Sequence, residues 1–292
     1  MVALVAHDAG GAEIVSSYAR RAGLSGVTSV RGPAQAIMSR KLPTWPDVPV
    51  TEAIAQCDWL LCGTSWQSDH ELTASQAARR SGKPVVAYLD HWVGYPERFT
   101  LRGEAVMPDE IWVGDQYAER IASQIFPGSP IRNVGNPYLQ DIQEELAERA
   151  ARIGPSESGP VLYICEPIGE QALLQHNDAH YWGYTEDEAL RYFFSRRAEL
   201  GLSAASVVLR LHPSERPGKY DWALRQYGPN VTLGGSESLL DAIASSQAVA
   251  GCGSMAMVIA LLAGKRVIST IPPGGDACPL PHDTIEILRD LP

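Results

Sequence analysis

The stretch VVLRLHPSE, residues 207–215, ends an apolar run with a cluster of polar side chains. Val207–Leu209 predicts a short buried strand, and Pro213 ends it because proline donates nothing to a sheet ladder. Open α/β sheets bind their ligands at the carboxyl ends of strands, where this cluster falls. As an imidazolium, His212 can donate to a phosphate and act as a general acid when that phosphate departs.

The same cluster supplies two further candidates for contact with a nucleotide. Arg210 offers a guanidinium, which suits bidentate contacts with phosphate or carboxylate. Glu215 offers the carboxylate that nucleotide sites use to hold ribose hydroxyls. A histidine beside a proline at a strand end is also common as a purely structural feature, and this alternative stays open.

A second stretch, AVAGCGSMAMVIALLAGKRVIS at 248–269, joins a strand to a helix through a glycine-rich turn. Ser254 stands where it would cap the helix, whose first N–H groups and dipole attract phosphate. Gly251 and Gly253 let a ligand approach the backbone closely. The alternative is an ordinary turn with a serine cap.

The elements that must position these residues follow a regular pattern. Short apolar runs alternate with longer amphipathic stretches, which predicts parallel sheets covered on both faces. Residues 152–160, RIGPSESGP, have the composition of a linker. We therefore expect an α/β fold with two Rossmann-like domains, 1–153 and 154–292, whose parallel sheets face each other across a cleft. Helices are expected near residues 12–22, 69–82, 116–126, 138–152, 186–200, 219–227, 237–245 and 254–263.

In combination these features resemble a known family. The HP pair at 212–213, the GxGS helix start at 251–254 and the stretch LLAGKRVIS at 261–269 resemble GT-B-fold glycosyltransferases. The resemblance is closest to bacterial sialyltransferases and Kdo transferases, which use CMP-activated nonulosonic acids. The segment PIRNVGNPYLQDI at 130–142 is similar to the exit from the first domain in many GT-B enzymes and nucleotide-sugar epimerases. RLHP also resembles CDP-glycerol phosphotransferases.

The resemblance implies roles for particular residues. His212 and Pro213 would contact CMP, and Ser254 would bind its phosphate. Asp90, at the end of a strand in the first half, would be the general base that takes the proton of an acceptor hydroxyl. The alternative for Asp90 is a cap or an ion pair with Arg98.

The resemblance also places the acceptor and the transferred sugar in the first half. His91 adjoins Asp90, and the aromatic side chains after it offer faces for sugar stacking, although such spacing is more typical of a core. The turn HDAGGAE at 7–13 lacks the third glycine of a dinucleotide fingerprint, so NAD binding is not expected. The GT-B picture brings this turn to the sugar or the acceptor, with a purely structural turn as the alternative. The candidates for acceptor or sugar binding are His7, Asp8, Gly10, Gly11, Ser65, His91 and Trp92.

Composition narrows the functional classes. The net charge of −10 argues against a nucleic-acid partner. Five cysteines show no metal-ligand spacing, and we expect Cys57 and Cys62 to be buried free thiols, which suits a reducing cytoplasm. The first residues resemble a strand rather than a signal peptide, and no apolar run reaches the roughly 20 residues of a transmembrane helix. Peripheral membrane contact is left open.

The resemblance therefore implies a cytoplasmic glycosyltransferase without metal or other cofactor. It is expected to transfer a nonulosonic acid, such as a sialic-acid-like sugar or Kdo, from a CMP-activated donor. Its acceptor is a glycan or a protein. Asp90 as base gives one displacement with inversion, whereas Glu166, at another strand end near the donor, would allow a retaining route. The alternatives are an epimerase or hydrolase of nucleotide sugars, a UDP-sugar glycosyltransferase, a CDP-glycerol-type phosphotransferase and a sugar-binding module without activity. The exact donor sugar and nucleotide, the acceptor, the stereochemical outcome and the oligomeric state are left open.

Overall fold

The computed structural model describes residues 1–65, 67–153 and 159–291. The chain forms two compact units, Met1–Asp141 and Ile142–Pro292, called unit 1 and unit 2 below. The division lies inside helix α7 (Pro137–Ile153), whereas the sequence placed it after residue 153. Most of the expected linker, residues 154–158, lies outside the described residues.

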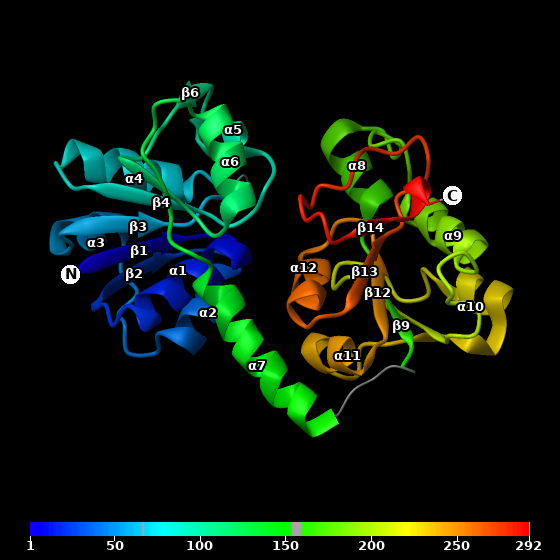
Figure 1. The fold of residues 1–292 in the computed structure, drawn as a ribbon. Helices are drawn as coiled ribbons and strands as arrows, with labels where there is room; N and C mark the ends of the chain where they lie inside the picture. The colour runs from blue at the N-terminus through cyan, green and yellow to red at the C-terminus, as the bar shows by residue number, and fades with distance from the viewer. Residues whose placement is uncertain (66, 154–158, 292) are drawn as a thin grey trace. The chain divides into compact units, whose positions relative to one another are not determined.

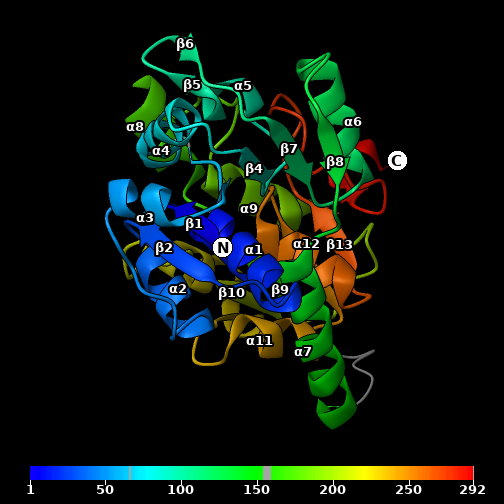
Figure 2. The same cartoon turned by 90° about the vertical axis from the view of Figure 1, so that its left-hand side faces the viewer.

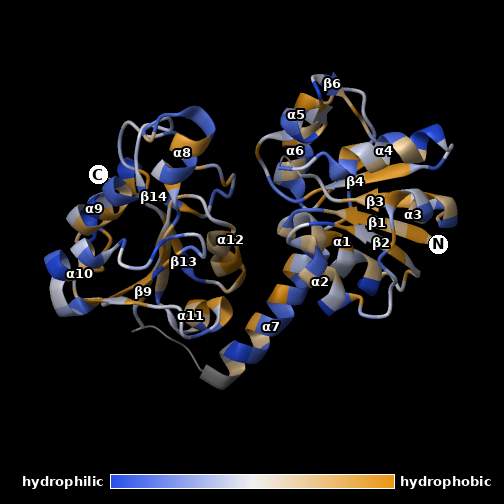
Figure 3. Cartoon of the chain, turned by 180° about the vertical axis from the view of Figure 1, so that it is seen from behind, coloured by the Kyte–Doolittle hydropathy of each residue, from blue (hydrophilic) through white to orange (hydrophobic). Residues whose placement is uncertain are grey.

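Unit 1 is built on a parallel sheet with the strand order β2-β1-β3-β4-β7-β8 (Figure 1). Every residue of β1 and β4 is buried, because helices cover both faces of this sheet. Figure 3 shows these central strands in the colours of apolar residues. The strands are β1 (Val2–Ala6), β2 (Gly26–Val30), β3 (Trp59–Cys62), β4 (Val85–Leu89), β7 (Glu110–Val113) and β8 (Ile131–Asn133).

The helices of unit 1 lie on both faces of the sheet. Right-handed crossovers that leave the sheet centre in opposite directions put α1 and α4 on opposite faces, and Figure 2 shows this arrangement. The side chains of α1 and α2 pack on one face, against Leu4, Leu61 and Trp112. The helices are α1 (Ala9–Arg21), α2 (Ala34–Lys41), α3 (Val50–Gln56), α4 (His70–Arg80), α5 (Tyr95–Arg98) and α6 (Gln116–Ile125), and a small hairpin joins β5 (Thr100–Leu101) to β6 (Glu104–Ala105).

Unit 2 repeats the plan with the parallel order β11-β10-β9-β12-β13-β14. Its core packs Tyr163, Leu209 and Ala250 of the sheet against Leu190 and Phe193. The strands are β9 (Val161–Ile164), β10 (Val207–Arg210), β11 (Val231–Leu233), β12 (Ala248–Gly251), β13 (Arg266–Ser269) and β14 (Glu286–Ile287). The helices are α8 (Ile168–His176), α9 (Glu186–Arg196), α10 (Asp221–Tyr227), α11 (Leu239–Ser245) and α12 (Met255–Leu262), with 3-10 turns at Gly228–Asn230 and Leu288–Asp290.

Strand order marks one position in each sheet as a natural ligand site. Chain order reverses between β1 and β3 in unit 1 and between β9 and β12 in unit 2. At such switch points the connections leave to opposite sides, and a crevice opens at the carboxyl ends of the strands. The residues that follow these strands are therefore the candidates for contact with a ligand.

The cysteines are placed as the sequence predicts. All five cysteines are free; Cys57 and Cys62 are buried, as predicted, and only Cys278 is partly exposed. Within the described ranges, no helix combines the length and the apolar character that a membrane crossing requires. Those same ranges hold no group of three or more His, Cys, Asp or Glu side chains that could bind a metal ion.

Candidate functional site

The switch point of unit 1 brings Asp90 against the first turn of α1. A Cβ atom at Gly10 would overlap with Oδ2 of Asp90, so glycine is required here by the carboxylate. A Cβ atom at Gly11 would lie 3.1 Å from the Cα atom of Gly63, which follows β3. Both glycines therefore serve close packing of the helix start on two strand ends, and Asp90 faces the positive end of the α1 dipole.

Asp90 is a nearly buried carboxylate with one engaged oxygen. Oδ1 accepts a hydrogen bond from Nη1 of Arg98 at 3.0 Å and lies 3.4 Å from the hydroxyl of Thr64. The side chain of Asp90 is 13% exposed. Burial raises the pKa of Asp90 above its ordinary value, and the Arg98 guanidinium opposes this increase. The ion pair considered from the sequence is present, and the side-chain donors Arg98 and Thr64 both contact Oδ1 rather than Oδ2.

His7 and Asp8 form a pair at the end of β1. Nδ1 of His7 lies 2.7 Å from Oδ1 of Asp8. Asp8 occupies the N-cap position of α1, yet its side chain accepts no backbone hydrogen bond there. A Cβ atom at Gly32 would meet the His7 ring, 2.7 Å from Nε2, so the ring is packed over that glycine. The turn is thus ordered by its own side chains.

Glu71 was missed by the sequence analysis and completes this cluster. Its side chain enters from α4, the residue is 2% exposed, and Oε1 accepts a hydrogen bond from the backbone N–H of His7 at 2.8 Å. Oε2 is buried without a hydrogen-bond partner among the described residues. Burial raises the pKa of Glu71 to about 7. The only signal in the sequence was its place in the polar segment 63–71, which gave no sign of burial.

Replacing Glu71 with glutamine is expected to stabilise unit 1 at alkaline pH. The folded carboxyl has a pKa of about 7 against an ordinary 4.5, so folding takes up a proton between these values and stability falls as pH rises. Above pH 7 the ionised side chain costs about 3 kcal/mol, which glutamine removes while it keeps an acceptor for His7. The free energy of unfolding, measured by urea titration at pH 4.5 and pH 8, should show a gain of about 1–3 kcal/mol at pH 8 alone.

Glu97→Gln serves as the control, because Glu97 is exposed on α5. A gain for Glu71→Gln of the same size at both pH values would contradict the proton uptake.

The remaining unit 1 candidates are more structural than the sequence suggested. Ser65 is buried, and its hydroxyl accepts a hydrogen bond from the N–H of Gln67. Burial lowers the pKa of His91 to about 4, so this ring is neutral at physiological pH. Trp92 is 6% exposed and donates its indole N–H to Asp115 at 2.9 Å. Trp92 therefore occupies a buried position, which was the alternative weighed from its spacing, and its role in sugar binding stays a prediction.

The switch point of unit 2 has a carboxylate inside the glycine-rich turn. Oε1 of Glu166, which follows β9, accepts hydrogen bonds from the N–H groups of Cys252 and Gly253, both at 2.9 Å. Burial raises the pKa of Glu166, and these backbone donors oppose the increase. The N–H groups that were expected to meet a phosphate thus hold a side chain of the same chain. Glu166 is turned to the turn backbone, which weakens the retaining route.

The glycines and the serine of this turn have local explanations. A Cβ atom at Gly253 would overlap with the ring of Pro279, and one at Gly251 would lie 3.2 Å from the carbonyl oxygen of Ile164. Ser254 is the N-cap of α12, and its hydroxyl accepts from the N–H of Ala256 at 3.3 Å. The serine cap is confirmed, and the role in phosphate binding stays a prediction.

The loop after β10, which contains His212, is held by hydrogen bonds and an ion pair of the buried Glu215. Glu215 is 7% exposed; its Oε2 accepts from the N–H of His212 at 2.8 Å, and its Oε1 accepts from the hydroxyl of Tyr220 at 2.7 Å. Lys219 lies 3.0 Å from the same Oε1. Both carboxylate oxygens of Glu215 bind the loop itself, and the expected ribose contact stays a prediction. Arg210 likewise donates to a backbone oxygen, that of Glu237, at 3.1 Å.

His212 and Pro213 are both exposed in this loop. The backbone N–H of Ser214 donates to Nδ1 of His212 at 3.2 Å, and the Ser214 hydroxyl lies 2.7 Å from the same atom. A backbone donor on Nδ1 places the proton of the neutral ring on Nε2. Nε2–H is therefore an outward donor in a fixed orientation, which is what a phosphate oxygen needs.

His212 and Ser254 follow strands on either side of β9. Because adjacent strands are about 4.8 Å apart, the two loops start roughly 10 Å from each other at one sheet edge. The negative charge of Glu215 lies close enough to Glu166 to raise the pKa of Glu166 further. The sheet thus brings the donor-side candidates together. Among them, the imidazole of His212 has a nitrogen, Nε2, for which no hydrogen bond within the described residues is found.

No family model matches the chain. No curated protein matches it either. Solved structures do match: a UDP-GlcNAc 2-epimerase from Methanocaldococcus jannaschii has a TM-score of 0.62 at 9% identity, covering 98% of this chain and 88% of that one. The UDP-GlcNAc 2-epimerase from Neisseria meningitidis bound to UDP-GlcNAc reaches 0.57 at 14% identity, over 94% and 83%. The glycosyltransferase SnogD from Streptomyces nogalater reaches 0.52 at 13% identity, over 100% and 88%.

At these identities the likeness shows the fold. The predicted α/β class with two Rossmann-like parallel sheets, as in GT-B proteins, is confirmed. The closeness to CMP-dependent enzymes and the roles of the site residues stay predictions.

Proposed function

We propose that this chain is a glycosyltransferase that takes a sugar, a nonulosonic acid, from a CMP-activated donor. The observation that carries this proposal is the Nε2–H donor of His212, fixed at the carboxyl end of β10 by Ser214 and Glu215. A departing phosphate gains negative charge, and a preoriented donor stabilises that charge without reorganisation. The likeness in fold to enzymes of nucleotide-sugar chemistry agrees with this assignment.

The reaction divides between the two units. Unit 2 holds the donor, with Nε2–H of His212 on its phosphate. Unit 1 supplies Asp90, and burial raises the pKa of this carboxyl, which makes it a stronger base than an exposed aspartate. The acceptor oxygen forms a bond to the anomeric carbon as its proton passes to Asp90. The bond from that carbon to the phosphate oxygen breaks, and CMP leaves with the electron pair, so the configuration inverts.

A second candidate is a nucleotide-sugar epimerase or hydrolase, favoured by the two UDP-GlcNAc 2-epimerases among the similar structures. Such an enzyme acts on the donor alone, and it needs an acid and a base but no acceptor. Incubation with UDP-GlcNAc in the absence of acceptor separates the two: conversion to an epimer or to free sugar supports the second candidate, and unchanged donor supports transfer.

Nucleotide binding tests the proposal directly. CMP, CDP and UDP are added to the protein, and the melting temperature is measured. A nucleotide at one hundred times its dissociation constant adds about 2.7 kcal/mol, which raises the melting temperature by about 5–10 °C. We expect CMP to give the largest rise and His212→Ala to abolish most of it, because the outward donor is lost.

His180→Ala is the matched control, since His180 is an exposed histidine of unit 2 whose Nε2 pairs with Glu188 at 3.2 Å. A full CMP response in His212→Ala, or no response to any nucleotide, would refute the donor site. A larger rise with UDP would redirect the assignment to a UDP-sugar enzyme.

A further inference from the structure

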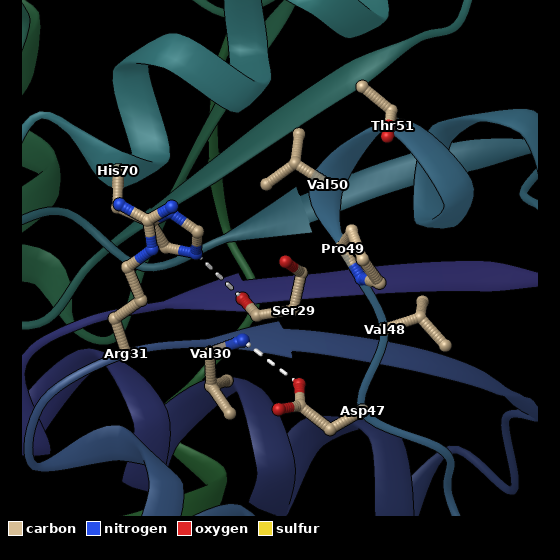
Figure 4. A pocket seen from close by; sticks show the side chains of 9 residues that line it. All are labelled: Ser29, Val30, Arg31, Asp47, Val48, Pro49, Val50, Thr51 and His70. Carbon is tan, nitrogen blue, oxygen red and sulfur yellow. Dashed lines mark hydrogen bonds between the residues drawn. The ribbon is translucent and has the colours of Figure 1, made fainter.

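A pocket of about 460 Å³ opens beside the end of β2 in unit 1, apart from the residues assigned above. Figure 4 shows the side chains that line it. Its volume lies in the usual range for small-molecule sites, roughly 300–1,000 Å³. The lining combines an apolar strip, Val48–Val50, with polar side chains from three segments of the chain: Ser29, Arg31, Asp47, Thr51 and His70.

Arg31 supplies a positive charge without a counter-ion. It directly follows β2, is exposed, and its side chain forms neither an ion pair nor a hydrogen bond with the described residues. An exposed guanidinium at a pocket wall can bind a carboxylate through two parallel hydrogen bonds. The pocket is therefore equipped for an anionic group on this side.

The other polar groups suit hydroxyls. Oδ1 of Asp47 accepts from the N–H of Val30 and from the hydroxyl of Thr28, both at 3.1 Å, while Oδ2 accepts nothing from the described residues. Nε2 of His70 lies 3.0 Å from the carbonyl oxygen of Ser29, so this nitrogen carries the proton and Nδ1 is an acceptor. Burial lowers the pKa of His70, which keeps the ring neutral. Free acceptors and the Thr51 hydroxyl are what sugar hydroxyls require.

We propose that this pocket binds the acceptor as a sugar that carries a carboxylate, with the carboxylate on Arg31, ring hydroxyls on Asp47 and Thr51, and the C–H face on Val48–Val50. This inference rests on the proposed function, since it names the acceptor of the transfer. An acidic ring matches the pocket better than a neutral one, because only the former uses the unpaired guanidinium.

The pocket adjoins the unit 1 candidates through the chain itself. Arg31 precedes Gly32, over which the His7 ring is packed, and His70 precedes Glu71, which holds the N–H of His7. A sugar in the pocket is thus next to the turn that carries His7 and Asp8.

Binding of two methyl glycosides tests the inference. Methyl β-D-glucuronide and methyl β-D-glucoside differ only at C6, which is a carboxylate in the first and a hydroxymethyl group in the second. Their dissociation constants are measured by calorimetry and by ligand-observed NMR on the whole chain. We expect the glucuronide to bind about tenfold more tightly, as a charge-assisted hydrogen bond predicts. Arg31→Gln should remove that difference, and Asp47→Asn should weaken both ligands.

Arg80→Gln is the matched control, an exposed arginine at the end of α4. Equal affinity for both glycosides, an unchanged preference in Arg31→Gln, or no binding of either ligand would overturn the inference. Melting temperatures of the variants confirm that they fold. The nucleotide response belongs to unit 2, so a CMP response without glucuronide binding refutes the acceptor class alone.

Discussion

Asp90→Asn is expected to lower kcat of sugar transfer by a factor of about 10²–10⁴, the usual contribution of a general base. Asparagine keeps an oxygen for the hydrogen bonds from Arg98 and Thr64, so the fold around Gly10 is preserved. It has no group that takes a proton from the acceptor hydroxyl. The assay uses the nucleotide class selected by thermal shift, and KM for the donor should change little, because Asp90 is assigned to the acceptor step.

The pH dependence of the transfer rate distinguishes loss of a base from a general loss of activity. Burial raises the pKa of Asp90, so the wild-type rate should fall with decreasing pH at values above the ordinary carboxyl range. The residual rate of Asp90→Asn should lack this dependence. Asp58→Asn is the control, because Asp58 is an exposed aspartate at the amino end of β3, whereas Asp90 follows the carboxyl end of β4. A variant at position 90 with wild-type kcat would exclude Asp90 as the base.

Lys219→Met is expected to destabilise unit 2 by about 3–5 kcal/mol, because it leaves buried carboxylates without their counter-ion. The lysine side chain is 8% exposed, and that of Glu215 is fully buried. Nζ also pairs with Glu186 and lies 3.1 Å from Glu170. Burial lowers the pKa of Lys219, but the three carboxylates outweigh this effect and raise it. Methionine fills similar space and leaves the negative charges facing one another.

Urea unfolding measured by hydrogen exchange in β9 and β10 reports on unit 2 alone. Glu170→Gln is the control, since that side chain is half exposed and its pair is worth about 0–1 kcal/mol. Equal effects of the two variants would show that Lys219 stabilises no more than a surface ion pair. The loop around His212 should exchange faster in Lys219→Met, because Glu215 holds the His212 N–H.

Most of the fold could be predicted because it depends on local pattern. Buried strands such as β1 and β4 are continuous apolar runs, and α9 begins with a full capping box at Thr185 and Glu188. The helices α2, α3, α5 and α8 were not predicted. Prolines at 33, 43, 46 and 49 flank α2 and precede α3, and such residues signal turns, which hid these two helices. The sequence therefore predicted the helix and sheet layers and the carboxyl ends of the strands where polar residues gather. It did not predict every helix between the strands.

The details of the site depend on contacts between distant residues, which no local pattern contains. Asp90 meets Gly10, and Glu166 meets the turn at Cys252, only after the sheet has formed. The burial of Glu71 follows from the packing of α4, which also explains its raised pKa. Residue types indicated where polar groups gather, and only the folded chain shows which of them are already occupied.

The seat of Glu166 in the turn before α12 has a consequence for selectivity. A carboxylate tethered to the same sheet competes with soluble anions at an effective concentration on the order of millimolar or above. Free phosphate and other abundant small anions therefore bind weakly at that turn, because each must displace the carboxylate of Glu166. A ligand that also binds elsewhere, for example through a base or a ribose, gains enough binding energy to displace the Glu166 carboxylate from the turn.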